Sequence, residues 1–567
     1  MKGAGRAPES GARPARHWRS PHRRAILTGA RPIPLAGLAV LFATTPDTET
    51  VECDAVVVGS GFGGAMTAWE LVAAGLRVVM IERGSWVDRG EHNWGAEGAF
   101  FRTPSYAADS TFRVLQARRW ADEKLCTCVG GPSVFYGGSS FRFREGDFAP
   151  GAEIVGDSAA AWPFAYDALE RCYSAAEALL GVAGAAGADP TEPPRTGPYP
   201  WPPAPLAHAS LRIEGAARAM GLRPFPIPLA IRYDGNAGCR RCTTCDAFAC
   251  AVGAKNDVAT RIIPELMRRG MELRANTVAT RIVADGGAAR ALECHDKETG
   301  GRLVVRAAAF VIAAGALATP HLLLASGVER MNPAGHAVGR YLMRHCNAMT
   351  YGLFPRRPNP GGEHHKQLAI HDYYFGAPER DAPRGKLGNI QQVMAPPASM
   401  LEYALPRAVA RLAVPLVAHM TGLLSIAEDQ PRAENGVRID PARQDRFGLP
   451  GMSVTHRYTP RDLAARAALV RRAARILRRA GAWGTVTWKV TTFSHAVGTV
   501  RMGDDERTAP LDPFCRFRGV ENLYVTDGSC FPTSAGVNPS LTIAANALRV
   551  GRHLASVLRR AHAGAAR

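Results

Sequence analysis

The chain has 567 residues, of which 46% are hydrophobic and 21% charged, and its formal net charge at pH 7 is +19. This length and apolar content predict two domains, or one large elaborated domain, with an extensive core. The basic residues are nearly all arginine and are spread along the chain, which excludes the single basic face typical of a nucleic-acid-binding protein. The excess charge still favours an acidic partner or peripheral association with a membrane surface.

Residues 1–50 are strongly basic and do not resemble a folded segment. Arg23 and Arg24, followed by the apolar run 34–43, resemble a twin-arginine export signal. The run begins with proline, however, and no clean cleavage site follows it. We therefore expect a basic extension on a cytoplasmic protein, with export to the periplasm as the alternative. No run of about 18 uninterrupted apolar residues occurs, so we expect no membrane span.

Residues 55–82 form the first distinctive pattern. Residues 56–58 are a short, continuous apolar run, as in a strand that is buried on both faces. A glycine-rich turn follows, then a helix to residue 74 and a second strand at residues 78–81. This order of strand, turn, helix and strand is typical of a nucleotide-binding unit.

The residues of this pattern have distinct roles in such a unit. Gly59 allows the tight turn, Gly61 lets the backbone approach a pyrophosphate, and Gly64 lets helix and strand pack closely. Glu82 ends the second strand, about 20 residues after the turn, where a carboxylate can accept a ribose hydroxyl. The combination favours a dinucleotide site over a glycine-rich turn without a ligand.

The passage from Glu82 to Lys124 is expected to be rich in loops, and residues 126–140 are then rich in glycine and suit a backbone close to a flat or charged ligand. A helix is expected to end at residue 180, and residues 184–205 are expected to form a surface connection.

The second distinctive pattern is a cysteine group with the spacing Cys-x2-Cys-x2-Cys-x4-Cys. Its members are Cys239, Cys242, Cys245 and Cys250. The spacing is close to that of ferredoxins, which predicts an iron–sulfur cluster; a zinc site and a group without metal are the alternatives. Cys126 or Cys128 could complete either metal site.

Further along the chain, residues 262–269 are expected to be helical, 271–283 and 304–314 to form strands, and 319–325 to form a helix. From about residue 345 to 489, short polar and apolar runs alternate, as in an antiparallel sheet covered by helices.

Two helices stand out in that middle part of the chain. Residues 406–424 are predicted to form a buried helix, with a lid over an apolar substrate as the alternative. Residues 463–480 are predicted to form a helix that Thr459 caps and whose arginine-rich face is solvated.

The C-terminal part holds several polar residues beside predicted elements. Residues 523–525 read as a strand, and Asp527 follows its C-terminal end, where ligands bind in open parallel sheets. His495 precedes this strand, and Asn538 precedes a closing helix at residues 541–550 whose N-terminus can point at the same ligand.

Together these motifs resemble the glucose-methanol-choline (GMC) oxidoreductase family of FAD enzymes. The resemblance rests on residues 55–82, 315–327, 338–345, 495–499 and 523–542, the last two reading HxxGT and LYVTDGS…GVNPSLT. It covers nearly all of the chain from residue 51 to the end.

The resemblance implies an α/β fold that is α+β overall. A Rossmann-like FAD-binding domain would be assembled from residues 51–150, 235–345 and 490–567. A substrate-binding domain built on an antiparallel sheet would be inserted as residues 151–234 and 346–489.

By the same resemblance His495 is the catalytic histidine and Asn538 the second active-site residue. The implied cofactor contacts are Gly59, Gly61, Phe62, Gly64, Glu82, Gly130, Gly131, Ser133, Val278, Asp527, Gly528, Asn538, Pro539 and Ser540. The loop at Gly130 departs from the family pattern at Pro132 and Tyr136, and it lacks the histidine to which some members attach FAD, so non-covalent FAD is expected. In some bacterial members a comparable cysteine group holds an iron–sulfur cluster.

The expected chemistry is oxidation of a CH–OH group. When hydride passes from an alcohol carbon to flavin N5, an imidazole such as that of His495 can accept the hydroxyl proton, and an amide can hold the oxygen. The predicted substrate is an apolar or sterol-like alcohol, and the electron acceptor is O2, a quinone or a partner protein. The alternatives are a cyanohydrin-type lyase of the same fold and a nicotinamide-dependent dehydrogenase.

Overall fold

The computed structural model describes residues 48–96, 98, 111–116, 119–235, 238–378 and 382–565. These residues belong to one compact unit, Pro46–Arg567. Almost all of the predicted basic extension or export signal, residues 1–50, lies outside the described residues. Among the described helices, none is long and apolar enough to cross a membrane.

The largest sheet has seven strands and is mixed, with the order β6-β2-β1-β9-β8-β7 and with β17 paired to β9. Strands β6, β2, β1, β9 and β17 run parallel to one another, whereas β8 pairs antiparallel with both β9 and β7. Its strands are β1 (Thr48–Val58), β2 (Val78–Ile81), β6 (Glu272–Arg274), β7 (Thr277–Asp285), β8 (Ala288–Asp296), β9 (Arg302–Ile312) and β17 (Leu523–Val525).

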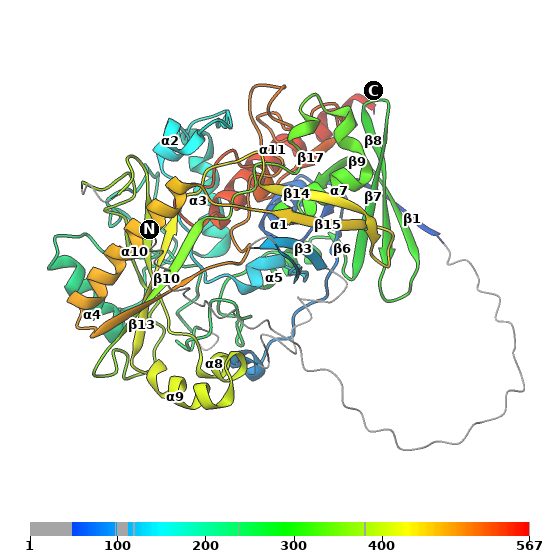
Figure 1. Ribbon diagram of the computed structural model, residues 1–567. Helices are drawn as coiled ribbons and strands as arrows, with labels where there is room; N and C mark the ends of the chain where they lie inside the picture. Colours follow the sequence, from blue (N-terminus) through cyan, green and yellow to red (C-terminus); the bar gives the residue numbers. More distant parts are fainter. Residues whose placement is uncertain are drawn as a thin grey trace, which may run out of the picture. The chain divides into compact units, whose positions relative to one another are not determined.

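The parallel part of this sheet is built from the predicted apolar runs. The C-terminal half of β1 is buried, and it lies between β2 and β9, both of which are also buried there. Helix α1 (Phe62–Ala73) follows β1, and helix α7 (Gly315–Ser326) follows β9. Helix α1 packs against α11 (Ser540–Ala565), so segments from the two ends of the chain lie side by side (Figure 1). The prediction of an α/β fold is confirmed.

A second sheet is antiparallel and has the order β16-β10-β13-β12-β11-β5. Its strands are β5 (Phe225–Pro226), β10 (Cys346–Leu353), β11 (Leu368–Ile370), β12 (Gly388–Val393), β13 (Met420–Ala427) and β16 (Gly484–Lys489). Helix α10 (Pro460–Arg479) packs on β10 and β13 (Figure 1). Thr459 caps α10, as predicted, because its hydroxyl accepts from Asp462 N at 3.1 Å.

A four-stranded sheet and several shorter helices complete the described structure. The sheet comprises β14 (Gly436–Gln444), β15 (Pro450–Thr455), β3 (Thr111–Gln116) and β4 (Arg119–Lys124). The remaining α-helices are α2 (Ala152–Val155), α3 (Asp167–Leu180), α4 (His208–Arg218), α5 (Val258–Arg261), α6 (Ile263–Arg268), α8 (Ala398–Ala404) and α9 (Arg407–Val417). The predicted division of the chain into two domains stays a prediction.

Three local predictions were wrong. The predicted loop-rich passage before Lys124 contains the paired strands β3 and β4, and β3 also pairs with β15, which lies in a distant part of the chain. The predicted helix 406–424 ends at Val417, and residues from Met420 onward form the buried strand β13. Helix α9 is also exposed rather than buried: Leu412 is 77% exposed, and only Ala410 of this helix is buried. The apolar composition alone could not distinguish an exposed helix followed by a core strand from one buried helix.

The exposure of α9 predicts a contrast between two leucines. Leu412→Ala should change the free energy of unfolding by no more than about 0.5 kcal/mol, because the side chain already contacts water. Leu469→Ala should cost about 2–5 kcal/mol, because that side chain of α10 is fully buried beneath the antiparallel sheet. Thermal and denaturant unfolding of the two variants measure the difference. Equal losses would contradict the exposed position of α9.

Candidate active site

The glycines of the turn after β1 differ in the space around them. Gly59 has a φ of +98°, and a Cβ there would lie 2.3 Å from Ala313 O. A Cβ at Gly64 would lie 1.9 Å from Gly59 O. A Cβ at Gly61, by contrast, would meet no atom within 4 Å. The backbone at Gly61 therefore borders open space at the N-terminus of α1, the arrangement that accommodates a pyrophosphate.

Glu82 lies at the end of β2 and joins this turn to the second strand. Its Oε2 accepts from Ser60 N at 3.1 Å and from Ser60 Oγ at 2.6 Å, and its Oε1 accepts from Gly84 N at 2.9 Å. Ser60 Oγ in turn accepts from Gly130 N at 2.9 Å. Burial raises the pKa of the Glu82 carboxyl group above its usual value. The glycine loop and the predicted ribose-binding acid are thus parts of one hydrogen-bonded group.

Three further predicted contacts lie next to this group. A Cβ at Gly131 would be 3.3 Å from Gly61 Cα, so the two glycine segments approach each other closely. Ser133 Oγ donates to Gly130 O at 2.6 Å and holds the loop in its turn. Strand β7 begins beside Glu82, because Thr277 N donates to Glu82 O at 2.9 Å, and this places Val278 near the end of β2.

Asp527 lies just beyond β17, at the same edge of the sheet. Its Oδ2 accepts from Gly315 N at 2.8 Å, at the start of α7, and its Oδ1 accepts from Ser529 N at 2.8 Å. A Cβ at Gly63 would lie 2.5 Å from Thr526 O, so the chain at β17 is against the first turn of α1. Burial raises the pKa of Asp527 as well. The C-terminal ends of β1, β2, β9 and β17 therefore gather most of the residues predicted to bind a dinucleotide.

The predicted catalytic pair is in contact. His495 Nε2 lies 3.3 Å from Asn538 Nδ2. The loop of His495 is tied to the residue after Asp527, because Gly498 N donates to Gly528 O at 3.0 Å. Asn538 itself lies two residues before α11, where Ser540 Oγ donates to Ser139 O in the glycine-rich loop at 3.2 Å. His495 and Asn538 thus lie at the border between the dinucleotide edge and the antiparallel sheet.

Two residues in this site had no predicted role. His345 Nδ1 is 2.9 Å from His495 Nδ1, and Gln391 Nε2 donates to Asn538 Oδ1 at 2.7 Å. His345 belongs to the 338–345 motif that carried part of the family resemblance, so a signal for it was present in the sequence. Gln391 lies in β12, within the alternating middle of the chain, where the sequence offers no comparable signal.

The environment of His495 favours its neutral form. Burial, followed by the nearby His345 and Lys366, lowers the pKa of His495 well below its usual range. Burial likewise lowers the pKa of His345. Both imidazoles are therefore neutral at neutral pH, and a neutral imidazole has one nitrogen free to accept a proton.

One face of the antiparallel sheet continues from Gln391 across its neighbours. In register with Gln391 lie Leu424 in β13, Met349 in β10 and Trp488 in β16, and residues in register share a face. Trp488 is 43% exposed, and its ring contacts that of Tyr351 at a centroid distance of 5.2 Å. The opposite face packs on α10. The face that adjoins Asn538 is therefore largely apolar and aromatic.

The predicted metal site at Cys239, Cys242, Cys245 and Cys250 is not supported. Among the described residues, no group of three or more His, Cys, Asp or Glu side chains could hold a metal ion, and Cys126 and Cys128 do not complete one. Burial raises the pKa of the Cys239 and Cys245 thiols. The segment is instead organised by a buried lysine, since Lys255 Nζ donates to Cys245 O at 2.8 Å and to Phe248 O at 2.7 Å.

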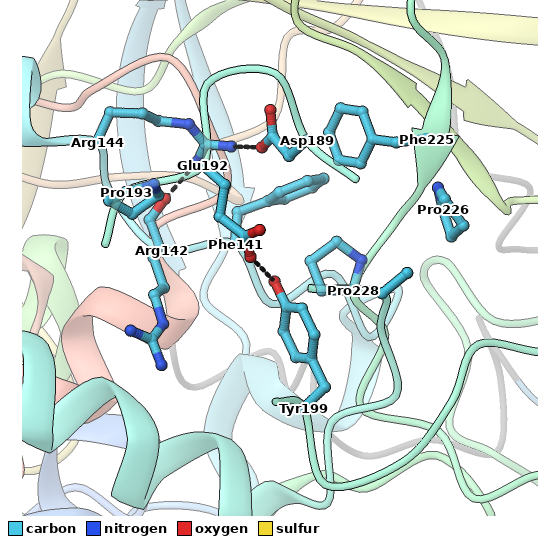
Figure 2. A pocket seen from close by; sticks show the side chains of 11 residues that line it. Phe141, Arg142, Arg144, Asp189, Glu192, Pro193, Tyr199, Phe225, Pro226 and Pro228 are labelled. Atoms are coloured by element: carbon cyan, nitrogen blue, oxygen red, sulfur yellow. Dashed lines mark hydrogen bonds and ion pairs between the residues drawn. The ribbon is translucent and has the colours of Figure 1, made fainter. Parts of the chain in front are cut away.

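A separate polar pocket contains none of the predicted site residues. Figure 2 shows Arg144 directed at Asp189, and Tyr199 directed at Glu192. The Tyr199 hydroxyl donates a hydrogen bond to Glu192 Oε1 at 3.4 Å. Arg142, at the same pocket, turns to Glu177 at 2.8 Å. Because the charges are paired with one another, we interpret this pocket as a structural link that fastens residues 185–199 to the rest of the chain.

Comparisons with known proteins agree with this geometry. Family models described as GMC oxidoreductase match residues 207–347 and 431–547, and one described as FAD dependent oxidoreductase matches residues 54–178. The structure also resembles that of pyridoxine 4-oxidase from Mesorbium loti, with a TM-score of 0.62 at 19% identity, over 88% of this chain and 99% of that one.

Two curated relatives align along most of their length. The chain is 32% identical to 6'''-hydroxyparomomycin C oxidase of Streptomyces lividus, over 94% of this chain and 96% of that protein. It is 31% identical to paromamine 6'-oxidase of Streptomyces fradiae, over 89% and 92%. The chain therefore belongs to the GMC oxidoreductase family, as an FAD-dependent oxidoreductase that acts on alcohol groups.

Proposed function

We propose that His495 accepts the hydroxyl proton of the alcohol while Asn538 orients the hydroxyl oxygen. The observation that carries this proposal is the contact of His495 Nε2 with Asn538 Nδ2 at 3.3 Å, because a neutral imidazole nitrogen that faces an amide donor can accept a proton in the same position. FAD, when bound, supplies the acceptor for the hydride. The protein's own contribution is to hold base, amide and substrate in one geometry.

The same proposal assigns the dinucleotide edge to FAD. The pyrophosphate would lie at Gly61, whose surroundings leave open space, and the ribose hydroxyls would lie near Glu82. Asp527, Gly528, Pro539 and Ser540 would follow the cofactor toward the flavin end, and Val278 would adjoin the adenine. The loop at Gly130 and Gly131 would pass close to the flavin, which stays non-covalent because the loop carries no histidine.

For the substrate we infer an alcohol with an apolar body. Leu424, Met349 and Trp488 share the sheet face that adjoins Asn538, and they offer dispersion contacts and an exposed ring. A sterol-like alcohol fits this face. A second candidate is an amino sugar, because two relatives are named as oxidases of paromomycin-type compounds and sugar rings also stack on aromatic faces.

The remaining alternatives concern the acceptor and the reaction class. The match to FAD dependent oxidoreductases sets aside a nicotinamide-dependent enzyme. Loss of the yellow flavin colour on addition of an alcohol separates an oxidoreductase from a cyanohydrin-type lyase. The acceptor as O2, a quinone or a partner protein, and the peripheral membrane association suggested by the net charge, stay predictions that acceptor assays and vesicle binding can test.

Gly61→Val should yield a folded protein that purifies without flavin. The added side chain would occupy the open space that the pyrophosphate needs. Gly215→Val is the matched control, because a Cβ at that exposed position of α4 also meets no atom within 4 Å. The absorbance of bound flavin relative to protein gives the occupancy. Full occupancy in Gly61→Val would refute the assignment.

His495→Ala should slow the reduction of bound flavin by alcohol about a hundredfold to ten-thousandfold, the usual cost of losing a general base. Asn538→Ala should lose less, because it orients without taking the proton. In the unmutated protein the rate should stay constant through neutral pH and fall only in acid, once the pH drops below the lowered pKa of His495. Stopped-flow absorbance measures each rate, and His562→Ala, an exposed histidine of α11, is the control. Unchanged rates in both site variants would place the chemistry elsewhere.

Trp488→Ala should raise KM for alcohols with a large apolar body by about tenfold, the effect of losing roughly 1.4 kcal/mol of contact. Small alcohols should be oxidised with unchanged KM, because they cannot reach this ring. Trp483→Ala is a control at a tryptophan that is 79% exposed and precedes the same strand. Equal KM values for large and small alcohols in Trp488→Ala would count against an apolar substrate face.

A further inference from the structure

His345 is held rigidly by groups that do not belong to the dinucleotide edge. The residue is 1% exposed, and its backbone N–H donates to Asp429 Oδ1 at 3.0 Å. Its carbonyl oxygen accepts from Tyr458 OH at 2.8 Å. Its φ of +60° is in the left-handed region, which is unfavourable for a residue with a Cβ. Strained backbone of this kind persists where the surroundings impose it, often beside an active site.

The hydrogen-bond partners of His345 determine which of its nitrogens carries a proton. Its Nε2 is 3.0 Å from both Ser534 O and Ala535 O. Carbonyl oxygens only accept hydrogen bonds, so Nε2 must carry a proton and donate it. Because burial keeps this imidazole neutral, its Nδ1 carries none and can only accept.

The state of His345 then fixes the state of His495. His345 Nδ1 and His495 Nδ1 are 2.9 Å apart, so a hydrogen bond between them requires the proton to be on His495 Nδ1. The Nε2 of a neutral His495 is then unprotonated, and this is the nitrogen that lies 3.3 Å from Asn538 Nδ2. The other tautomer would place an N–H at the position where the base has to accept a proton.

We propose that His345 is a positioning residue that holds His495 in the tautomer with an unprotonated Nε2 facing the substrate. This inference rests on the proposed role of His495 as the base. In this role His345 acts through its contact with His495 Nδ1. Its chain of contacts ends at backbone carbonyls, which cannot change their protonation, so the tautomer is set by the fold itself.

The groups around the pair are consistent with this assignment. The charged and titratable neighbours are Asp429, His456, Lys366, Lys386 and Tyr458. Asp429 is buried and ionised, because hydrogen bonds and nearby histidines offset its burial and lower its pKa. It accepts a hydrogen bond from the backbone N–H of His345 and none from the imidazole ring, whose Nδ1 contacts His495. The carboxylate therefore helps to align His345 without stabilising a doubly protonated ring.

Two isosteric variants separate positioning from packing. In His345→Asn the amide oxygen can take the place of Nδ1 and accept from His495, so flavin reduction by alcohol should stay within about threefold of the unmutated rate. In His345→Gln the amide reaches the place of Nε2 and leaves His495 Nδ1 without an acceptor. The rate should then fall at least about tenfold, the lower end of the cost of losing such a partner. KM should change little in either variant. His562→Asn is the control, because His562 is an exposed histidine of α11 that has no contact with this pair.

A second readout observes the tautomer directly. Nitrogen-15 NMR of histidine-labelled protein distinguishes protonated from unprotonated ring nitrogens, and comparison with His495→Ala assigns the signals. His495 should show a protonated Nδ1 in the unmutated protein and in His345→Asn, and a mixture of tautomers in His345→Gln. Equal rates and equal tautomers in the Asn and Gln variants would overturn the inference.

Failure of the base assignment gives a different result. If His495→Ala reduces flavin at the unmutated rate, the proposed base is wrong, whatever the state of His345. If His495→Ala is slow while both His345 variants remain fast, the base stands and only the positioning role of His345 is refuted.

Discussion

The parallel pairing of β1 with β9 is the interaction on which the rest of the structure depends. The two strands pair along their whole length, from Thr48 opposite Arg302 to Val58 opposite Ile312, and β17 joins β9 over Phe310–Ile312. Because parallel strands end at the same edge, the turn after β1, the start of α7 and Asp527 are brought together from sites hundreds of residues apart. The dinucleotide edge is a consequence of this one register.

The close approach of the backbones at that edge explains why packing requires glycine at some positions of the turn and not at others. Gly59 abuts Ala313, Gly63 abuts Thr526, and Gly64 abuts the carbonyl oxygen of Gly59, each at a distance that a Cβ could not share. Gly61, the glycine predicted to let the backbone approach a pyrophosphate, has no such neighbour. Gly59, Gly63 and Gly64 therefore serve the packing of the protein, whereas Gly61 leaves space beside the backbone.

The antiparallel sheet supplies the other half of the site. Its two faces have different partners. One face packs on α10, and on the other face Gln391 donates a hydrogen bond to Asn538. The cysteine segment adjoins the same region, because Asp246 forms an ion pair with Lys366, whose charge contributes to the lowered pKa of His495. That segment therefore contributes to the electrostatics of the site through a carboxylate–ammonium pair, whereas its thiols form no metal site among the described residues.

The sequence by itself determined the elements whose signals are local. The strands and helix of residues 55–82, the cap of α10 by Thr459, and the motifs that identify the family all depend on neighbouring residues, so their pattern sufficed. Only the tertiary structure decided that α9 is exposed, that β3 pairs with β15, and that Gln391 and His345 contact the predicted catalytic pair. The physical reason is that burial, strand partners and hydrogen-bond donors come from distant segments, and no local pattern specifies which distant segment will arrive.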